Sequence, residues 1–429
     1  MAVLAPAVVP EKLNTLTAVL DLIRDGRAST RPGVARLSGL GRTATTQRLT
    51  QLIEARLIEE GPLGASTGGR APRELRFRSH AGNLLVAELG ATTLNIGLSD
   101  LEGRLLAQRQ EQIDVSDGPD ATLAHVEGVF DDMIAARPSD APPVWGIGIG
   151  LPGPVEFATG RPVAPPIMPG WDGYAVRDRL AARYDVPVWV DNDVNLMALG
   201  EFRGGLADSE RDIVFLKVGT GIGAGLISGG RLHRGAQGSA GDVGHVAMTD
   251  DASVICRCGN VGCLEALAGG FALVRDATAA AHEGRSPILA RLAQPGGRLS
   301  VADVAVAAEH GDPVSVELLT RAGQQIGRML AALVNFFNPS LIIVGGAVTG
   351  GTAGDLVLAA IRQTIYGRSL PLATRELRIA HSPLSNNAGL TGAAFMAIDE
   401  LFEPECLARW IDAGAPTGRP DVVLSGVLE

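Results

Sequence analysis

The stretch that decides the fold runs over residues 241–265 and reads GDVGHVAMTDDASVICRCGNVGCLE. It contains three of the four cysteines of the 429-residue chain, Cys256, Cys258 and Cys263, and His245 lies a short distance upstream. Three thiolates and one imidazole are the donors that Zn²⁺ prefers, and four such ligands complete a tetrahedron with no open position. Glycines within the cysteine run allow the sharp turns that bring the sulfurs together. The sequence therefore predicts a structural zinc site.

A second interpretation of the same residues needs no metal. The thiols and the histidine could be ordinary core side chains, or two of the cysteines could form a disulfide. An odd number of cysteines in a short run, in a chain without a secretory signal, disfavours the disulfide. The metal site is the interpretation that the residue types favour.

The segments on either side of the cysteines resemble a known family. GDVGH before the cluster and CLE after it resemble the signature of the ROK family of repressors, open reading frames of unknown role and kinases, and the resemblance covers about residues 81–400. In that family the zinc loop shapes a sugar pocket. The resemblance implies that Asp242, the free nitrogen of His245, and Glu265 bind sugar hydroxyls. The family usually has glutamate at the position of Asp242, which is one methylene shorter.

Composition and charge set the outer limits. With 46% hydrophobic residues, the chain can form two or three domains with sizeable cores. No run approaches the ~20 apolar residues of a membrane span, and the N-terminus lacks a signal-peptide pattern, so we expect a cytoplasmic protein without a membrane partner. Residues 1–80 carry 12 Lys and Arg against 7 Asp and Glu, whereas the remainder carries 25 against 40. Only the first 80 residues favour a polyanionic partner.

The first 80 residues predict a winged helix-turn-helix. Apolar residues at helical spacing predict a helix over 11–25, a second from about residue 30 and a third over 42–56. The turn before the third helix falls at the glycines of 39–41. The glycine-rich segment 57–78 reads as a two-stranded wing.

The third helix carries candidate DNA contacts on the side opposite its apolar face. Hydroxyl, amide and guanidinium groups there match what a recognition helix presents to base edges, although an ordinary solvated helix face has the same pattern. The predicted recognition residues are Arg42, Thr43, Thr46 and Gln47. The wing resembles the Gly-Gly-Arg-x-Pro element of ROK repressors, so we expect Arg70 to enter a minor groove and Arg73 to contact phosphate.

Residues 84–103 read as two strands joined at Gly90. They resemble the first phosphate loop of actin-like sugar kinases, an Asp-x-Gly-Gly-Thr pattern. Here Glu88 replaces the Asp and Ala91 replaces the second Gly, while Thr92 is kept. Both substitutions add bulk where the backbone must approach an anion. Glu88 could still reach a magnesium-bound water, so the departure argues against phosphoryl transfer without excluding it.

Two later glycine motifs resemble the remaining nucleotide-binding elements of the family. Residues 215–227 match the second phosphate loop, in which backbone amides converge on an anion, although a plain glycine-rich hairpin has the same pattern. Residues 342–348 read as the analogous nucleotide-side turn. The positions that the resemblance implies are Gly219, Thr220, Gly221, Gly223, Gly345 and Gly346.

Two segments resemble the sugar side of the cleft. Residues 145–155 read as a buried strand ending in a tight loop, at which the main chain of Gly153 would approach the ligand; a plain strand-to-loop turn explains the spacing equally well. Asn192 and Asp193 resemble the family's Asn-Asp pair, in which the amide binds a sugar hydroxyl and the carboxylate accepts the proton of the hydroxyl being phosphorylated. The carboxylate could equally be a plain hydrogen-bond acceptor, or Asp191, Asn192 and Asp193 could cap the next helix.

Strands with glycine turns, followed by helices, recur in residues 84–195 and 213–349. This repetition predicts an α/β fold with two lobes of the actin-like, ribonuclease-H-like type and a cleft between them. The expected divisions are a DNA-binding domain at 1–80, a first lobe at 81–195 completed by a late helix near 388–402, a second lobe with the zinc loop at 196–387, and a loose tail at 410–429.

The sequence thus predicts a sugar-responsive transcriptional regulator, specifically a repressor. It would bind operator DNA through the winged helix and a sugar or sugar phosphate in the cleft, as a homodimer or homotetramer. The first alternative is an ATP-dependent hexose kinase that carries a DNA-binding domain, with Asp193 as base and ATP and Mg²⁺ as cofactors. A sensor that binds a protein partner instead of a sugar is the second alternative.

Overall fold

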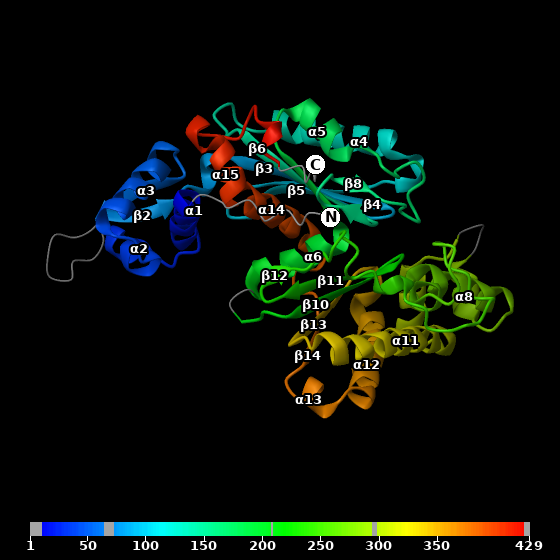
Figure 1. Ribbon diagram of the computed structural model, residues 1–429. Helices are drawn as coiled ribbons and strands as arrows, with labels where there is room; N and C mark the ends of the chain where they lie inside the picture. Colours follow the sequence, from blue (N-terminus) through cyan, green and yellow to red (C-terminus); the bar gives the residue numbers. More distant parts are fainter. Residues whose placement is uncertain (1–10, 64–72, 207–208, 294–297, 424–429) are drawn as a thin grey trace, which may run out of the picture.

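The computed structural model describes residues 11–63, 73–206, 209–293 and 298–423. A small N-terminal head is followed by two α/β lobes, with the first lobe above and the second below in the view of Figure 1. Each lobe is built on a five-stranded sheet, and the strand order is the same in both. The duplication predicted from the repeated motifs is confirmed.

The head is the predicted winged helix-turn-helix. Its helices are α1 (Glu11–Arg24), α2 (Arg31–Ser38) and α3 (Arg42–Glu54), and its wing pairs β1 (Ile58–Leu63) antiparallel with β2 (Arg73–Phe77). The hydroxyl of Thr30 accepts a hydrogen bond from the Gly33 amide and caps α2, which ends at Gly39 in the left-handed conformation. Leucines from α1 and α3 are fully buried between these elements.

The first lobe has the strand order β5-β4-β3-β6-β9, with antiparallel pairing from β5 to β3 and parallel pairing from β3 to β9. Its strands are β3 (Asn83–Leu89), β4 (Thr93–Ser99), β5 (Leu105–Gln112), β6 (Val144–Leu151) and β9 (Val188–Asn192). Side chains alternate between the two faces of a strand. On β3, Leu85 and Ala87 pack under α4 (Pro119–Ala135) and α5 (Val176–Tyr184), whereas Leu84 and Val86 face α14 (Ala388–Leu401). A short hairpin, β7 (Val155–Glu156) and β8 (Arg161–Pro162), follows β6.

The second lobe repeats this plan in the order β12-β11-β10-β13-β14. Its strands are β10 (Ile213–Val218), β11 (Ile222–Ser228), β12 (Arg231–Leu232), β13 (Leu341–Gly345) and β14 (Arg378–His381). One face packs on α6 (Asp193–Glu201), and the other packs on the long helices α11 (Pro313–Phe337) and α12 (Gly351–Arg368). The remaining helices of this lobe are α7 (Leu264–Ala268), α8 (Gly270–His282), α9 (Pro287–Leu292), α10 (Val301–Glu309) and α13 (Pro371–Thr374).

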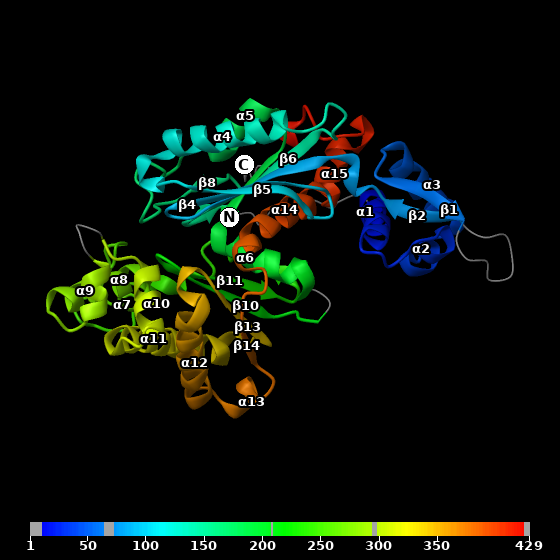
Figure 2. The ribbon, with the colours of Figure 1, turned by 180° about the vertical axis from the view of Figure 1, so that it is seen from behind.

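Helices α6 and α14 lie together between the two sheets (Figure 2). They approach closely because glycines face backbone atoms: a Cβ on Gly392 would lie 1.7 Å from the Leu196 carbonyl oxygen, and one on Gly200 would lie 2.0 Å from the Ala388 carbonyl oxygen. Only glycine fits at such a contact. As expected, the late helix α14 returns to the first lobe, where it packs on β3 and β6.

The end of the chain corrects the expectation of a loose tail at 410–429. Helix α15 (Pro404–Trp410) continues α14, and Trp410 is fully buried with its ring centroid 5.3 Å from that of Trp145. Val422 and Val423 are buried as well. Glycines and prolines in this segment resembled a linker, but its apolar side chains anchor it to the first lobe. Residues 424–429 lie outside the described residues.

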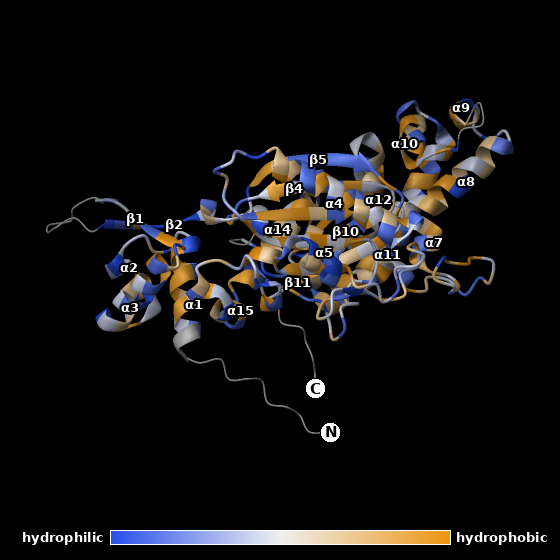
Figure 3. Cartoon of the chain, turned by 90° about the horizontal axis from the view of Figure 1, so that it is seen from above, coloured by the Kyte–Doolittle hydropathy of each residue, from blue (hydrophilic) through white to orange (hydrophobic). Residues whose placement is uncertain are grey.

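The head shares its hydrophobic core with the first lobe. Phe402, at the end of α14, packs edge-on against Phe77 of the wing, with ring centroids 5.9 Å apart. The Arg24 guanidinium of α1 lies 5.6 Å from the centre of the Phe402 ring and 3.9 Å from the Asp399 carboxylate. Helices α1 and α15 lie side by side (Figure 3). The head is therefore docked on the end of α14 and on α15.

No helix in the described part of the chain is both long enough and apolar enough to cross a membrane.

Candidate functional site

A cavity of about 580 Å³ separates the two lobes. Its walls come from the β3–β4 turn and the end of β9 in the first lobe, and from the β10–β11 turn and the end of β13 in the second. The structure brings every predicted sugar and phosphate residue to this cavity: Glu88, Thr92, Gly153, Asn192, Asp193, Gly219, Thr220, Gly221, Gly223, Asp242, His245, Glu265, Gly345 and Gly346.

The cysteine cluster forms one wall of the cavity through His245. One ligand atom from each of His245, Cys256, Cys258 and Cys263 lies within 4.8 Å of all the others. The Cys258 and Cys263 sulfurs are 3.8 Å apart, and the Cys256 sulfur is 3.6 Å from His245 Nδ1. With zinc bonds of about 2.3 Å to sulfur and 2.0 Å to nitrogen, the edges of a tetrahedron are about 3.8 and 3.5 Å. These residues therefore fit a tetrahedral metal ion.

The protonation chemistry of the cluster agrees with that fit. Burial, followed by the neighbouring sulfurs, raises the pKa of Cys263 to about 12, so a thiolate at this position needs a cation beside it. All four cysteines of the chain are free thiols, so the disulfide alternative is wrong. Cys406, the fourth, is buried in the core away from the cluster.

Glycines hold the loop in contact with β11. A Cβ on Gly241 would lie 1.9 Å from the Ala224 carbonyl oxygen, and one on Gly244 would lie 2.0 Å from the Ile222 carbonyl oxygen. The short 3₁₀ turn Val243–His245, which includes Gly244, carries the histidine. His245 turns Nδ1 to the cluster, and its Nε2 lies 3.9 Å from the Asp242 carboxylate at the cavity wall. One imidazole thus joins the metal cluster to the cavity.

Glu265 ties the same loop to the second glycine turn. It lies in the first turn of α7, directly after Cys263 and Leu264, and its carboxylate accepts a hydrogen bond of 3.1 Å from the Ile222 amide. A Cβ on Gly221 would lie 2.3 Å from this carboxylate, which explains the glycine. The sugar-side and phosphate-side elements of the second lobe therefore form one connected wall.

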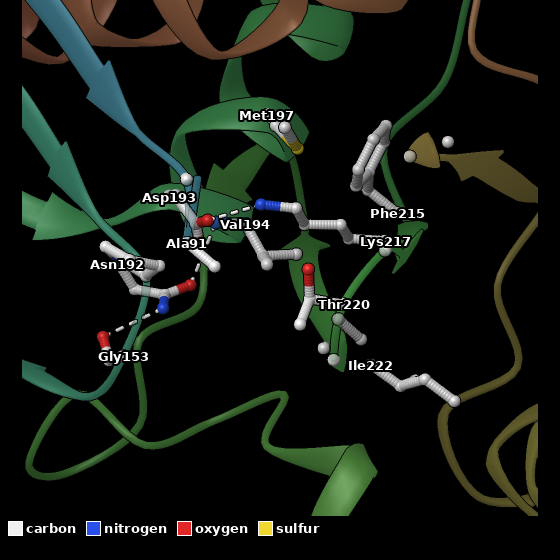
Figure 4. A pocket seen from close by; sticks show the side chains of 18 of the residues that line it. Ala91, Gly153, Asn192, Asp193, Val194, Met197, Phe215, Lys217, Thr220 and Ile222 are labelled. Atoms are coloured by element: carbon white, nitrogen blue, oxygen red, sulfur yellow. Dashed lines mark hydrogen bonds and ion pairs between the residues drawn. The ribbon is translucent and has the colours of Figure 1, made fainter. Parts of the chain in front are cut away.

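Asn192 has the capping role that was left open as an alternative. Its side-chain oxygen accepts hydrogen bonds from the Val194 and Asn195 amides at the start of α6. Its amide group donates a 2.9 Å hydrogen bond to the Gly153 carbonyl oxygen (Figure 4). An amide nitrogen carries two hydrogens, so this contact uses one of them. The cap fixes Asn192 and Gly153 at the cavity wall.

Lys217 is the residue that sequence reasoning missed. Its ammonium group is ion-paired with Asp193, the first residue of α6, across the floor of the cavity (Figure 4). Burial acts to lower the pKa of Lys217, but the carboxylates of Asp193 and Glu88 outweigh it and raise the value. The available signal was a lone charge within the apolar run of residues 213–227.

Glu88 lies close to this pair and is almost completely buried. Burial raises its pKa to about 7, while Lys217 acts in the opposite direction. The Asn95 side-chain amide donates a 3.1 Å hydrogen bond to the Glu88 carboxylate. Burial thus favours the neutral form of this carboxyl group, and the neighbouring Lys217 favours the ionised form.

The predicted recognition residues lie on the exposed side of α3. Arg42, Thr43, Thr46 and Gln47 are all solvent-exposed. Arg73, on the second strand of the wing, is also exposed and lies 3.9 Å from the Glu60 carboxylate. Arg70 falls within residues 64–72, outside the described residues.

The fold and the site define a class of protein in which a winged helix-turn-helix head is joined to a two-lobed, actin-like body with a polar cavity between the lobes. A model of the ROK family matches residues 85–400, and the chain belongs to the ROK family.

Comparison with individual proteins separates two groups within that family. A putative xylose repressor from Caldicellulosiruptor sp. is 29% identical over 91% of this chain and 97% of its own length. A glucokinase from Streptomyces coelicolor is 33% identical over 72% of this chain and 96% of its own length. A solved structure described as a ROK family transcriptional regulator and homologue of the E. coli MLC protein superposes with a TM-score of 0.80, at 27% identity, covering 94% of this chain and 99% of the other.

Proposed function

We propose that this protein is a transcriptional repressor whose affinity for operator DNA is set by a sugar in the interlobe cavity. The observation that carries the proposal is the docked head: an exposed recognition helix belongs to a domain whose core continues into α14. The comparison supports it, because the repressor relative matches 91% of the chain and the glucokinase matches 72%. A head of this kind has no part in phosphorylating a sugar.

The coupling between cavity and head is proposed to run through α6 and α14. Asp193 at the cavity begins α6, and α6 packs on α14 through the glycine contacts described above. The far end of α14 carries Asp399 and Phe402, which contact Arg24 of the head. A sugar that favours one arrangement of the lobes shifts α6 and α14 together, and the head moves with them.

The metal cluster is proposed to hold Zn²⁺ through His245, Cys256, Cys258 and Cys263. When bound, the ion supplies a rigid tetrahedral link between the two arms of the loop. His245 then keeps Nε2 on the cavity side, beside Asp242, where it can hydrogen-bond to a sugar hydroxyl. The loop is proposed to respond to sugar binding, because the His245 imidazole is at once a metal ligand and a sugar contact.

The proposed sugar contacts are the main chain at Gly153 and the side chains of Asn192, Asp193, Asp242, His245 and Glu265. D-Xylose and D-glucose are the first ligands to test, because related proteins are described as xylose repressors and glucokinases. The proposed DNA contacts are the exposed residues of α3, together with Arg70 and Arg73 of the wing. Repressors read paired half-sites, so we propose a homodimer or homotetramer.

The test begins with the intact protein and needs no known operator. Random duplexes retained by the protein are sequenced, and the enriched duplex is titrated by fluorescence anisotropy at one salt concentration, with and without each sugar. The proposal expects one sugar to change DNA affinity by a factor of about 5 to 150. A protein that retains no specific duplex is not a DNA-binding regulator.

A second candidate function is an ATP-dependent hexose kinase. The observation that favours it is the cavity itself, which Gly219, Thr220 and Gly221 line together with Asp193. Incubation with ATP, Mg²⁺ and hexoses tests it. Turnover at 1 s⁻¹ or faster, roughly the lower end of ordinary kinase rates, that is abolished by Asp193→Asn would establish the kinase.

A further inference from the structure

A charged triad crosses the floor of the cavity, and each member comes from a different element. Lys217 stands on β10 of the second lobe, Asp193 begins α6, and Glu88 stands on β3 of the first lobe. The side chains of Asp193 and Lys217 are 4% and 20% exposed, so their ion pair is largely withdrawn from water. Asp193 and Glu88 are the charged groups that act on Lys217.

The surroundings fix the position of each member. Asn95 holds the Glu88 carboxylate through a 3.1 Å hydrogen bond, and a Cβ on Gly389 of α14 would lie 2.2 Å from a Glu88 carboxylate oxygen. Asp193 is held by the first turn of α6, which Asn192 caps. The ammonium group of Lys217 therefore has little freedom to leave the carboxylates.

This arrangement changes what Asp193 can do to a sugar. A general base must be free to accept the proton of the hydroxyl that attacks the phosphoryl group. The Lys217 ammonium group donates a hydrogen bond to one oxygen of the Asp193 carboxylate, so that oxygen is already engaged and is not open to take the proton of a sugar hydroxyl. The ionised carboxylate remains a good acceptor for a hydroxyl that keeps its own proton.

The same ammonium group competes with a metal ion. In phosphoryl transfer, a divalent cation held by carboxylates neutralises the charge that develops on the phosphate. Lys217 already supplies a positive charge to Asp193 and Glu88, the two acidic groups of this cavity floor. One ammonium against two carboxylates also leaves no spare positive charge there for an anionic ligand.

We propose that Lys217 determines the ligand class of the cavity. It holds Asp193 as a fixed hydrogen-bond acceptor, so that the cavity binds a neutral sugar and does not phosphorylate it. The inference rests on the proposed sugar site. It adds the class of ligand and a reason why the ligand is not phosphorylated. Lys217 is a positioning residue, because it acts on the sugar through Asp193.

The experiment uses the full chain, its Lys217→Met variant, which keeps the length of the side chain without its charge, and Lys217→Arg, which keeps the charge. Binding of D-xylose, D-glucose and D-glucose 6-phosphate is measured by calorimetry between pH 6 and pH 9. ATP turnover with D-glucose and Mg²⁺ is measured in parallel, and thermal melting shows that each variant is folded.

The charge difference predicts the result. In Lys217→Met, the Asp193 carboxylate loses the hydrogen bond that holds it, and the Glu88 carboxyl group loses the cation that lowers its pKa, so the cavity floor takes up a proton at higher pH than in the native chain. Affinity for the neutral sugar should then fall more steeply with decreasing pH than in the native chain, by up to about tenfold per pH unit. Lys217→Arg should follow the native profile, and the native chain should prefer the neutral sugar to its phosphate.

Several results overturn this inference while leaving the sugar site intact. They are ordinary kinase turnover by the native chain, tighter binding of the sugar phosphate, or the same pH profile in the native chain and Lys217→Met. If Lys217→Met does not fold, Lys217→Gln replaces it and must show the same steepened profile. If the native chain binds neither sugar nor sugar phosphate, the proposed function fails as well.

Discussion

The contact between α14 and the head makes one prediction that separates coupling from stability. Phe402 is fully buried where the head meets the body, and its substitution by leucine keeps an apolar side chain while removing the ring. We expect Phe402→Leu to bind sugar normally and to bind DNA, but to lose most of the effect of sugar on DNA affinity. The head would then no longer follow α14.

The magnitude follows from the contacts of the ring. Phe402 packs against Phe77 at 5.9 Å and Trp410 at 6.1 Å, and each such aromatic pair contributes about 0.5–1.5 kcal/mol beyond buried area. The Arg24 guanidinium 5.6 Å from the ring centre adds about 0.5–1 kcal/mol. The variant therefore loses roughly 1.5–4 kcal/mol around the junction, which is comparable to the 1–3 kcal/mol of a typical allosteric coupling.

Phe130→Leu is the matched control. Phe130 is equally buried in the first lobe, but it lies under the sheet against Tyr184, at a centroid distance of 6.0 Å, in a core that includes none of the described residues of the head. Both variants are compared by urea unfolding and by anisotropy titration of the enriched duplex, with and without sugar. Equal sugar responses in the two variants would show that the junction does not transmit the signal.

Three further predictions concern the metal loop, the DNA surface and the buried acid. Cys258→Ser should lose the metal, measured by elemental analysis, and should weaken sugar binding in calorimetry; metal-free protein with native sugar affinity would speak against the proposed role of the loop. Arg42→Ala should weaken specific DNA binding by about 1–3 kcal/mol at fixed salt, whereas Arg104→Ala, at an exposed site on the first lobe, should not. Because burial raises the pKa of Glu88 from 4.5 to about 7, its contribution to stability is present below pH 4.5 and is lost as the pH rises through 7. Glu88→Gln should therefore reduce the loss of unfolding free energy between pH 5 and pH 8 by up to roughly 3 kcal/mol; an unchanged slope would refute the shift.

The sequence was informative where the fold depends on local pattern. The strands and glycine turns of the two lobes were predicted because apolar runs and glycines are properties of short segments. The clustering of the three cysteines with His245 was predicted for the same reason: Cys256, Cys258 and Cys263 lie so close in the chain that a few turns bring their sulfurs together. The recognition helix was placed within two residues of its observed bounds.

The sequence was uninformative where partners come from distant segments. Lys217 and Asp193 are 24 positions apart on a strand and a helix, and no spacing rule pairs them. The docking of the last described residues depends on Trp410 meeting Trp145, a contact across more than half of the chain. The sequence could not distinguish two roles of Asn192, because helix capping and ligand binding both favour an asparagine at this position. The hydrogen bonds from the Val194 and Asn195 amides show the cap.

We propose that one chain carries both a DNA-reading head and a sugar-binding body, and that the body controls the head. The most direct measurement of this control is the affinity of the metal-loaded protein for its enriched duplex, at one salt concentration, in the presence of each sugar that raises its melting temperature. At least one of these sugars is expected to change that affinity fivefold or more. Stabilising sugars that all leave DNA affinity unchanged would contradict it.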